Sequence, residues 1–166
     1  MRVSRTVRSP SARPLLCLLL LLALPAASQR VPGGHYEAPM PGKPLCTLDI
    51  HVTGFRNSRG KAGGVVFGSA AGWPEDRSRA VVQGGFAIGD RQVTETFQVP
   101  PGRYAIVVIH DENENQKLDR NFFGIPKEGF GFANNPRVIF SAPSWRTAST
   151  AVTCPATHVD IHLNYK

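Results

Sequence analysis

The sequence contains no apolar run long enough to cross a membrane as a helix. The longest run, residues 15–24, is about half of the roughly 20 residues that a spanning helix needs. Arginines precede it and two alanines and a serine follow it, an order typical of a secretory signal peptide. We expect cleavage of residues 1–28 and a secreted or periplasmic product without a membrane span; a retained anchor is the alternative.

The sequence also lacks a cluster of Lys and Arg residues interleaved with aromatic ones. Its net charge is +7, from 19 basic and 12 acidic residues. Residues 1–28 hold four of the basic residues and no acid, so the net charge of the mature chain falls to +3. A nucleic-acid interface needs a basic patch or stripe, and we expect no nucleic-acid partner.

Motifs of common enzyme classes are missing. There is no G-x-S-x-G elbow, no phosphate-binding glycine loop and no H-E-x-x-H pair. We therefore expect a protein that is not an enzyme. The alternative is a metal-dependent envelope hydrolase, in which His110, Asp111 and Glu128 would have to converge around an open coordination position.

Cysteine is scarce, with three residues, one of which lies in the signal region. Export would place the other two, Cys46 and Cys154, where disulfides persist. We expect them to form a bridge that closes a loop of about 100 residues. Two unpaired thiols are the alternative.

Residues 29–44 are rich in proline and glycine and are typical of a linker. The remaining residues, 45–166, suit a single domain. Apolar and polar residues alternate with a period of two in several short segments, which indicates half-buried strands. The expected strands are 48–53, 64–68, 93–99, 104–109 and 158–165, with weaker candidates at 137–140 and 147–153. Residues 73–85 are polar and irregular, with at most one helical turn expected.

About seven short strands with Gly/Pro turns, and no amphipathic helix, predict an all-β fold. We expect an immunoglobulin-like or transthyretin-like β-sandwich, with a small β-barrel as the alternative. The segment 104–109 is almost continuously apolar, so it should form a central strand buried on both faces.

Directly after that segment, oxygen-bearing side chains recur at every second residue. Calcium takes six to eight oxygen ligands, which a loop supplies from alternate positions and a backbone carbonyl. The candidate ligands are Asp111, Asn113, Asn115, the backbone carbonyl of Lys117, Asp119 and, from further along the chain, Glu128.

This loop departs from the helix–loop–helix calcium motif at two positions. Gln116 stands where that motif has a glycine, and Phe122 where it has a bidentate glutamate. Calcium is thus the one cofactor that the sequence suggests, in a loop carried by a strand. The alternative is an Asx-rich turn whose Asp and Asn side chains bond their own backbone.

Four phenylalanines follow the loop, separated by glycines: Phe122, Phe123, Phe130 and Phe132. Aromatic side chains give a large contact area at low entropic cost, so they are a candidate platform for a carbohydrate, a peptide or another envelope ligand. The alternative is an ordered loop that folds these rings onto the edge of the sandwich.

Three histidines are a weaker candidate site. By alternation His158 and His162 share the solvated face of the last strand, and His51 lies on that of the first. If those strands pair, a periplasmic zinc or copper site becomes a further alternative. A solvated polar face gives the same pattern.

The middle of the chain resembles an uncharacterised bacterial family of exported proteins, domain of unknown function 2141. The resemblance covers residues 48–165 and implies a secreted or periplasmic β-domain without an assigned activity. Gln116 departs from the family, which usually has glycine there. The Pro-Pro-Gly-x-Tyr turn is also similar to that of transthyretin-like sandwiches. The family's pattern is carried by residues 100–105, His110-Asp111, Asn113, Asn115, Leu118-Asp119, Asn121-Phe122, 124–126, 128–132 and 143–145.

Overall fold

The computed structural model describes residues 44–166; the expected signal peptide and almost all of the expected linker lie outside this part. The described chain is almost entirely strands and loops. One short 3-10 helix, η1 (Arg77–Arg79), interrupts them, and no described helix is long and apolar enough to cross a membrane. The strands are β1 (Cys46–Thr53), β2 (Lys61–Phe67), β3 (Val82–Ala87), β4 (Val93–Val99), β5 (Gly102–Asp111), β6 (Phe130–Phe132), β7 (Ser149–Val152) and β8 (Ala156–His162).

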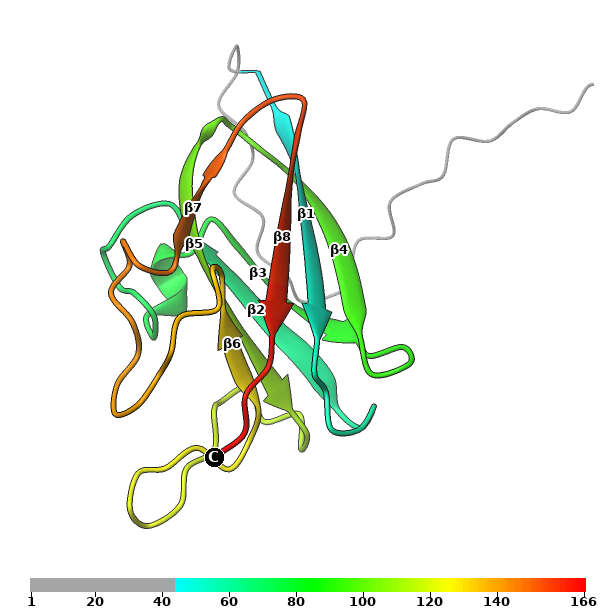
Figure 1. Cartoon of the computed structure of the whole chain (residues 1–166), viewed down its shortest axis with the longest axis vertical. Helices are drawn as coiled ribbons and strands as arrows, with labels where there is room; N and C mark the ends of the chain where they lie inside the picture. Colours follow the sequence, from blue (N-terminus) through cyan, green and yellow to red (C-terminus); the bar gives the residue numbers. More distant parts are fainter. Residues whose placement is uncertain (1–43) are drawn as a thin grey trace, which may run out of the picture.

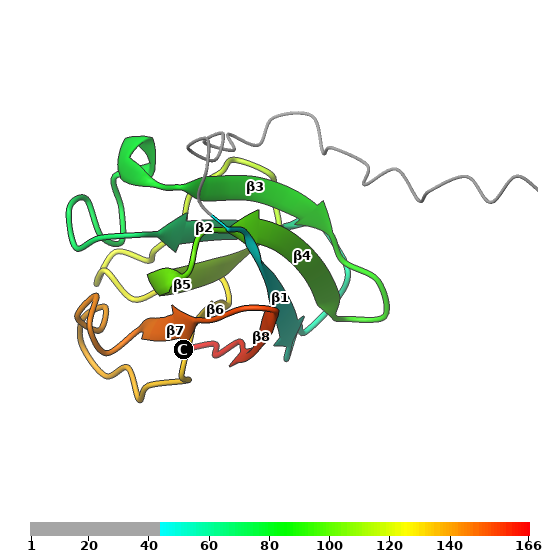
Figure 2. The ribbon, with the colours of Figure 1, turned by 90° about the horizontal axis from the view of Figure 1, so that it is seen from above.

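The strands form two packed sheets (Figures 1 and 2). In the first sheet β1 lies between β4, which is antiparallel to it, and β8, which is parallel to it. The second sheet has the order β3-β2-β5-β6, and β7 pairs with the first half of β5. The prediction of an all-β sandwich is confirmed, and the alternative of a closed barrel is wrong.

The core lies between the sheets and follows the predicted period of two. Leu48, Ile50 and Val52 point inward from β1 and are buried. Ile106 and Val108 of β5 belong to the same cluster from the other sheet. β5 is buried on both faces from its third residue onward, as its apolar run predicts.

The predicted bridge between Cys46 and Cys154 is present. It joins the first residue of β1 to the turn before β8 and spans 108 positions of the sequence. It therefore holds the two ends of the domain against each other.

Three local predictions were wrong. Residues 82–85, expected to be irregular, belong to β3; residues 130–132, expected in a loop, form β6; and residues 137–140, a weaker strand candidate, form no strand. Glycines explain β3: a Cβ at Gly84 would lie only 2.9 Å from the ring of Phe86. The bare backbone makes room for this ring, but it also removes the alternating side chains by which a strand is recognised.

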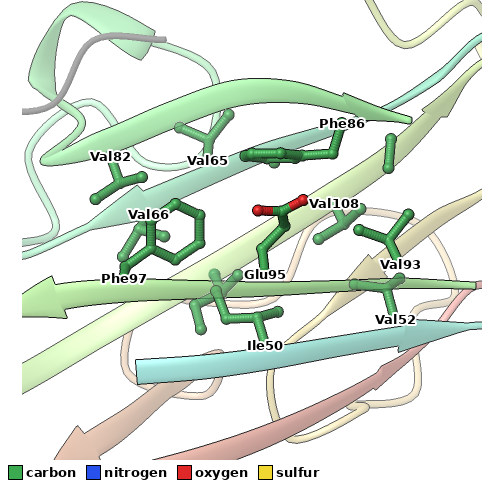
Figure 3. A pocket seen from close by; sticks show the side chains of 13 residues that line it. Ile50, Val52, Val65, Val66, Val82, Phe86, Val93, Glu95, Phe97 and Val108 are labelled. Carbon is green, nitrogen blue, oxygen red and sulfur yellow. The ribbon is translucent and has the colours of Figure 1, made fainter. Parts of the chain in front are cut away.

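Glu95 occupies an inward-facing position on β4, on the same face as Val93 and Phe97. It lines a narrow, otherwise apolar slit between the sheets, and Figure 3 shows its carboxylate pointing toward Phe86. Burial raises the pKa of Glu95 above its ordinary value. β4 is an edge strand. An inward-pointing charged residue on such a strand is one of the features by which proteins avoid edge-to-edge aggregation.

The outer face of the second sheet, turned away from the first sheet, is also apolar. Val65, Val107 and Ile109 form part of a second buried cluster there. Loops cover this cluster in place of another sheet: the Trp73 indole N–H donates to the Pro143 carbonyl, and that of Trp145 to the Phe67 carbonyl. Loops thus take the place of a third layer on this outer face.

Candidate functional site

The Asp/Asn loop, residues 111–119, leaves the end of β5 and is closed by its own hydrogen bonds. The buried Asp111 carboxylate accepts the backbone N–H of Asn115 at 3.0 Å and that of Gln116 at 2.6 Å. The side-chain oxygens of Asn113 and Asn115 accept the backbone N–H groups two residues ahead of them. These are the Asx turns that the plain-turn alternative predicts.

Three side chains of the loop converge on one another. The amide nitrogen of Asn113 donates to Asp119 Oδ2 at 2.8 Å, and that of Asn115 donates to Asp119 Oδ1 at 3.0 Å. A calcium ion at this point would have to replace these two bonds and attract the amide oxygens instead. Within residues 44–166 no group of three or more His, Cys, Asp and Glu side chains is arranged to hold a metal.

Gln116 takes the backbone conformation that the helix–loop–helix motif assigns to glycine. Its φ is 63°, in the left-handed region that residues other than glycine rarely adopt. The loop therefore has the sharp turn of a calcium loop, but with glutamine in place of the glycine that adopts this conformation without strain. The buried Asp111 carboxylate, bonded to the Gln116 N–H, helps to hold this strained residue.

Glu128 clamps both ends of the Asp/Asn loop. Its two carboxylate oxygens accept the backbone N–H of Glu112 and that of Asp119, each at 3.0 Å. The side chain is buried and lies two residues before β6. Glu128, one of the predicted metal ligands, thus does lie next to the Asp/Asn loop. Its carboxylate oxygens, however, bond the loop's backbone N–H groups.

A small hairpin, residues 119–127, follows the loop. Arg120 and Pro126 pair as an antiparallel bridge, and the side-chain oxygen of Asn121 accepts the N–H groups of Phe123 and Ile125. Phe122 and Phe123 at its tip are 97% and 80% exposed.

The four candidate platform residues therefore divide into two pairs. Phe130 and Phe132, on β6, are only 4% and 6% exposed and belong to the apolar cluster of the outer face. The two rings of the hairpin tip, in contrast, are free to contact a ligand.

An outer groove of about 990 Å³ lies between this hairpin and the segment 138–142. Its floor consists of the outer-face residues Val65, Val107, Ile109, Phe130 and Phe132. Phe123 and Ile125 line one side, and Ile139 and Phe140 another. In Figure 1 the yellow hairpin segment lies at the lower end of the molecule beside the C-terminus, whose last residue, Lys166, also lines the groove.

Sequence reasoning missed most of this groove. Ile139 and Phe140 were assigned to a strand, but they are 56% and 98% exposed on a loop. Arg77, on η1, was not singled out at all. A short apolar run flanked by prolines, residues 137–142, was the available signal for an exposed loop.

His110 is fully buried, and both of its ring nitrogens are occupied. The Arg59 carbonyl can only accept, so Nε2 carries a proton and donates to it at 2.8 Å. The Tyr165 hydroxyl, which accepts the Arg56 N–H, then donates to Nδ1 at 2.7 Å. His110 thus ties the segment between β1 and β2 to Tyr165. Within residues 44–166 it does not form a metal-binding group with Asp111 and Glu128, as the hydrolase alternative requires.

The three histidines of the transition-metal alternative, His51, His158 and His162, lie on the solvated face of the first sheet and have separate partners. His51 Nδ1 lies 3.1 Å from an Asp160 oxygen, and His158 Nδ1 lies 3.1 Å from an Asp49 oxygen. His162 contacts the hydroxyl of Thr53. The strands pair as the transition-metal alternative assumed, but the described part of the chain does not bring the three rings to one point.

One protein family matches the chain. Its model, described as "Uncharacterized protein conserved in bacteria (DUF2141)", matches residues 50–160, about two thirds of the sequence. No curated protein and no solved structure matches.

Proposed function

The chain belongs to this family of uncharacterised bacterial proteins, and we propose that it is an exported, non-enzymatic binding domain whose ligand lies in the outer groove. A single observation carries the proposal: large apolar side chains stand exposed on both sides of a groove with an apolar floor. These are Phe123, Ile125, Ile139 and Phe140.

Exposed phenylalanines are unfavourable in water unless they have a partner. Burying one such side chain stabilises a complex by roughly 1.5–3 kcal/mol, and contiguous exposed apolar patches mark binding sites in soluble proteins. The groove volume of about 990 Å³ is at the upper end of the range for small-molecule sites. A ligand lying on the floor would cover rings from both sides at once.

Export is supported by the bridge between Cys46 and Cys154, because structural disulfides are rare in the reducing cytoplasm. The amino-terminal segment with signal-peptide character points the same way. We propose the periplasm or the exterior of the cell as the site of action.

Titration with Nile red, a neutral apolar dye, tests the groove. We expect saturable binding with a blue shift in emission, weakened at least fivefold in Phe123→Ser and in Phe140→Ser. Leu45→Ser is the control, because Leu45 is also an exposed apolar residue but does not line the groove. Absence of saturable binding, or equal binding by all variants, would contradict the proposal.

Calcium binding by the Asp/Asn loop is the second candidate function. The favouring observation is that Asn113, Asn115 and Asp119 converge and that Gln116 holds a left-handed φ. A dissociation constant of about 0.1–1 mM, as in extracellular modules, would stabilise the fold by about 1.4–2.7 kcal/mol in 10 mM calcium.

Thermal melting with 10 mM calcium or with chelator checks this second candidate. We expect a higher melting temperature in calcium, and loss of the increase in Asp119→Ala but not in Glu114→Ala. Glu114 is the matched acid, because it lies in the same loop and pairs outward with Lys61. Equal melting temperatures in calcium and in chelator would leave the loop as an Asx-rich turn.

A further inference from the structure

We propose that the ligand of the outer groove is a free single-chain anionic amphiphile, with the chemistry of a fatty-acid carboxylate. Arg77 would hold the anionic head and the apolar floor the chain. This inference rests on the proposed function, since it names the chemical class that the groove accepts.

Arg77 is the first observation. Its guanidinium lies on the outer face beside β2, 3.5 Å from where a Cβ of Gly63 would stand, and the Ile109 side chain lies against the same point. Because Gly63 has no side chain, Ile109 and the Arg77 guanidinium can both lie close over the backbone of β2. Arg77 is half-buried, lines the groove and forms no side-chain hydrogen bond or ion pair within residues 44–166.

An unpaired guanidinium over apolar side chains is unusual, because a partly desolvated charge normally has a partner. Arg79, two residues further along, shows the ordinary situation: it is more exposed and its Nε lies 3.9 Å from Asp76. Arg77 therefore has the geometry of an anchor for an anion that enters the groove, and guanidinium is well suited to bind a carboxylate through two hydrogen bonds.

The other charges around the groove agree with this assignment. The cations Lys117, Arg120 and Lys166 line it together with Arg77, against one acid, Glu75. None of these four cations forms an ion pair within the described residues. Arg120 and Lys166 bond only backbone carbonyls, those of Gly124 and Val138. The charged side chains of the groove thus sum to +3, and this excess of cations favours an anionic ligand.

The floor of the groove would contact the hydrocarbon chain of the ligand. Val65, Val107 and Ile109 each keep less than 10% of their surface exposed, although they line the groove. Little of each floor side chain is exposed, so a slender unbranched chain is enough to cover the apolar surface at the base. Phe123 and Phe140 supply the apolar surface above the base.

Calorimetric titration of the protein with three twelve-carbon probes tests the inference: dodecanoate, dodecanol and dodecyltrimethylammonium, all below their micellar concentrations. We expect dodecanoate to bind at least tenfold more tightly than dodecanol, and the cationic probe to bind most weakly. Tenfold corresponds to about 1.4 kcal/mol, just under the roughly 1.5–3 kcal/mol of one hydrogen bond to a charged group.

Two variants assign the head group. Arg77→Gln should weaken dodecanoate binding at least tenfold and leave dodecanol binding unchanged. Arg79→Gln, the matched control, should change neither, because Arg79 lies outside the groove.

The outcomes separate the two proposals. Equal binding of the three probes, or an Arg77→Gln variant that binds dodecanoate normally, would overturn the anionic ligand but keep the apolar groove. If no probe binds, both fail. Sedimentation with anionic phospholipid vesicles in the absence of dodecanoate binding would show that the groove and its cations dock on a membrane surface, which also overturns the inference.

Discussion

Replacing Glu128 by Gln should destabilise the fold by about 2–4 kcal/mol. The carboxylate accepts two backbone N–H groups, those of Glu112 and Asp119, and it is buried. Glutamine retains one accepting oxygen and turns an NH₂ group toward the second N–H. This leaves a part-buried donor unpaired, at about 1–3 kcal/mol, and reduces the remaining bond from charge-assisted to neutral, at about 1 kcal/mol.

Urea unfolding at pH 7 measures this loss, and hydrogen exchange localises it to the amides of Glu112 and Asp119. Glu114→Gln is the matched control, because Glu114 is an exposed acid of the same loop whose partner is Lys61; its urea midpoint should not change measurably. The slope of the unfolding free energy against urea should remain the same in both variants. A Glu128→Gln protein as stable as the original would refute the idea that this carboxylate closes the loop.

Three further predictions concern other parts of the fold. Replacing Cys46 and Cys154 together by Ser should cost about 4–5 kcal/mol of unfolding free energy in the chain-entropy model, given their separation of 108 positions; reduction of the original protein should give the same urea midpoint. Burial raises the pKa of Glu95, so stability should fall as the pH rises from the ordinary pKa of glutamate through the raised folded value; Glu95→Gln should remove this part of the pH dependence and raise the urea midpoint at pH 7. Gly129→Ala places a Cβ 2.4 Å from the Tyr165 ring, which must move away from His110; unfolding in urea should show a loss of about 2–4 kcal/mol, and an unchanged midpoint would contradict the close packing.

The elements that could be predicted are those whose side chains carry a period. β4 has the expected bounds, Val93–Val99, because both ends of its inward-facing series are apolar and polar residues alternate with that series. The apolar run before Asp111 correctly indicated a central strand, β5. The cysteine pair needed only the expected compartment and the scarcity of cysteine.

The elements that could not be predicted depend on contacts between distant residues. β6 is three residues long, and a Cβ at Gly131 would lie 2.7 Å from the Ile161 side chain, so its glycine is required by β8 and not by its own neighbours. The groove combines residues from Gly63 to Lys166, and no local pattern joins them. Arg77 looks like any surface arginine until its position over Gly63 and at the groove is known.

The Asp/Asn loop and the outer groove belong to one structural unit, and Glu128 connects them. The chain leaves β5 at Asp111, passes through the loop and the hairpin, and returns at Glu128 to β6, whose two phenylalanines form part of the groove floor. Because Asp111 and Glu128 satisfy the backbone donors of the loop, the base of the hairpin is ordered before any ligand arrives. A ligand then has to order only the exposed tip, which lowers the entropic cost of binding. On this reasoning the oxygen-rich loop contributes to ligand affinity whether or not it binds calcium, and Glu128→Gln should weaken Nile red binding even in the presence of chelator.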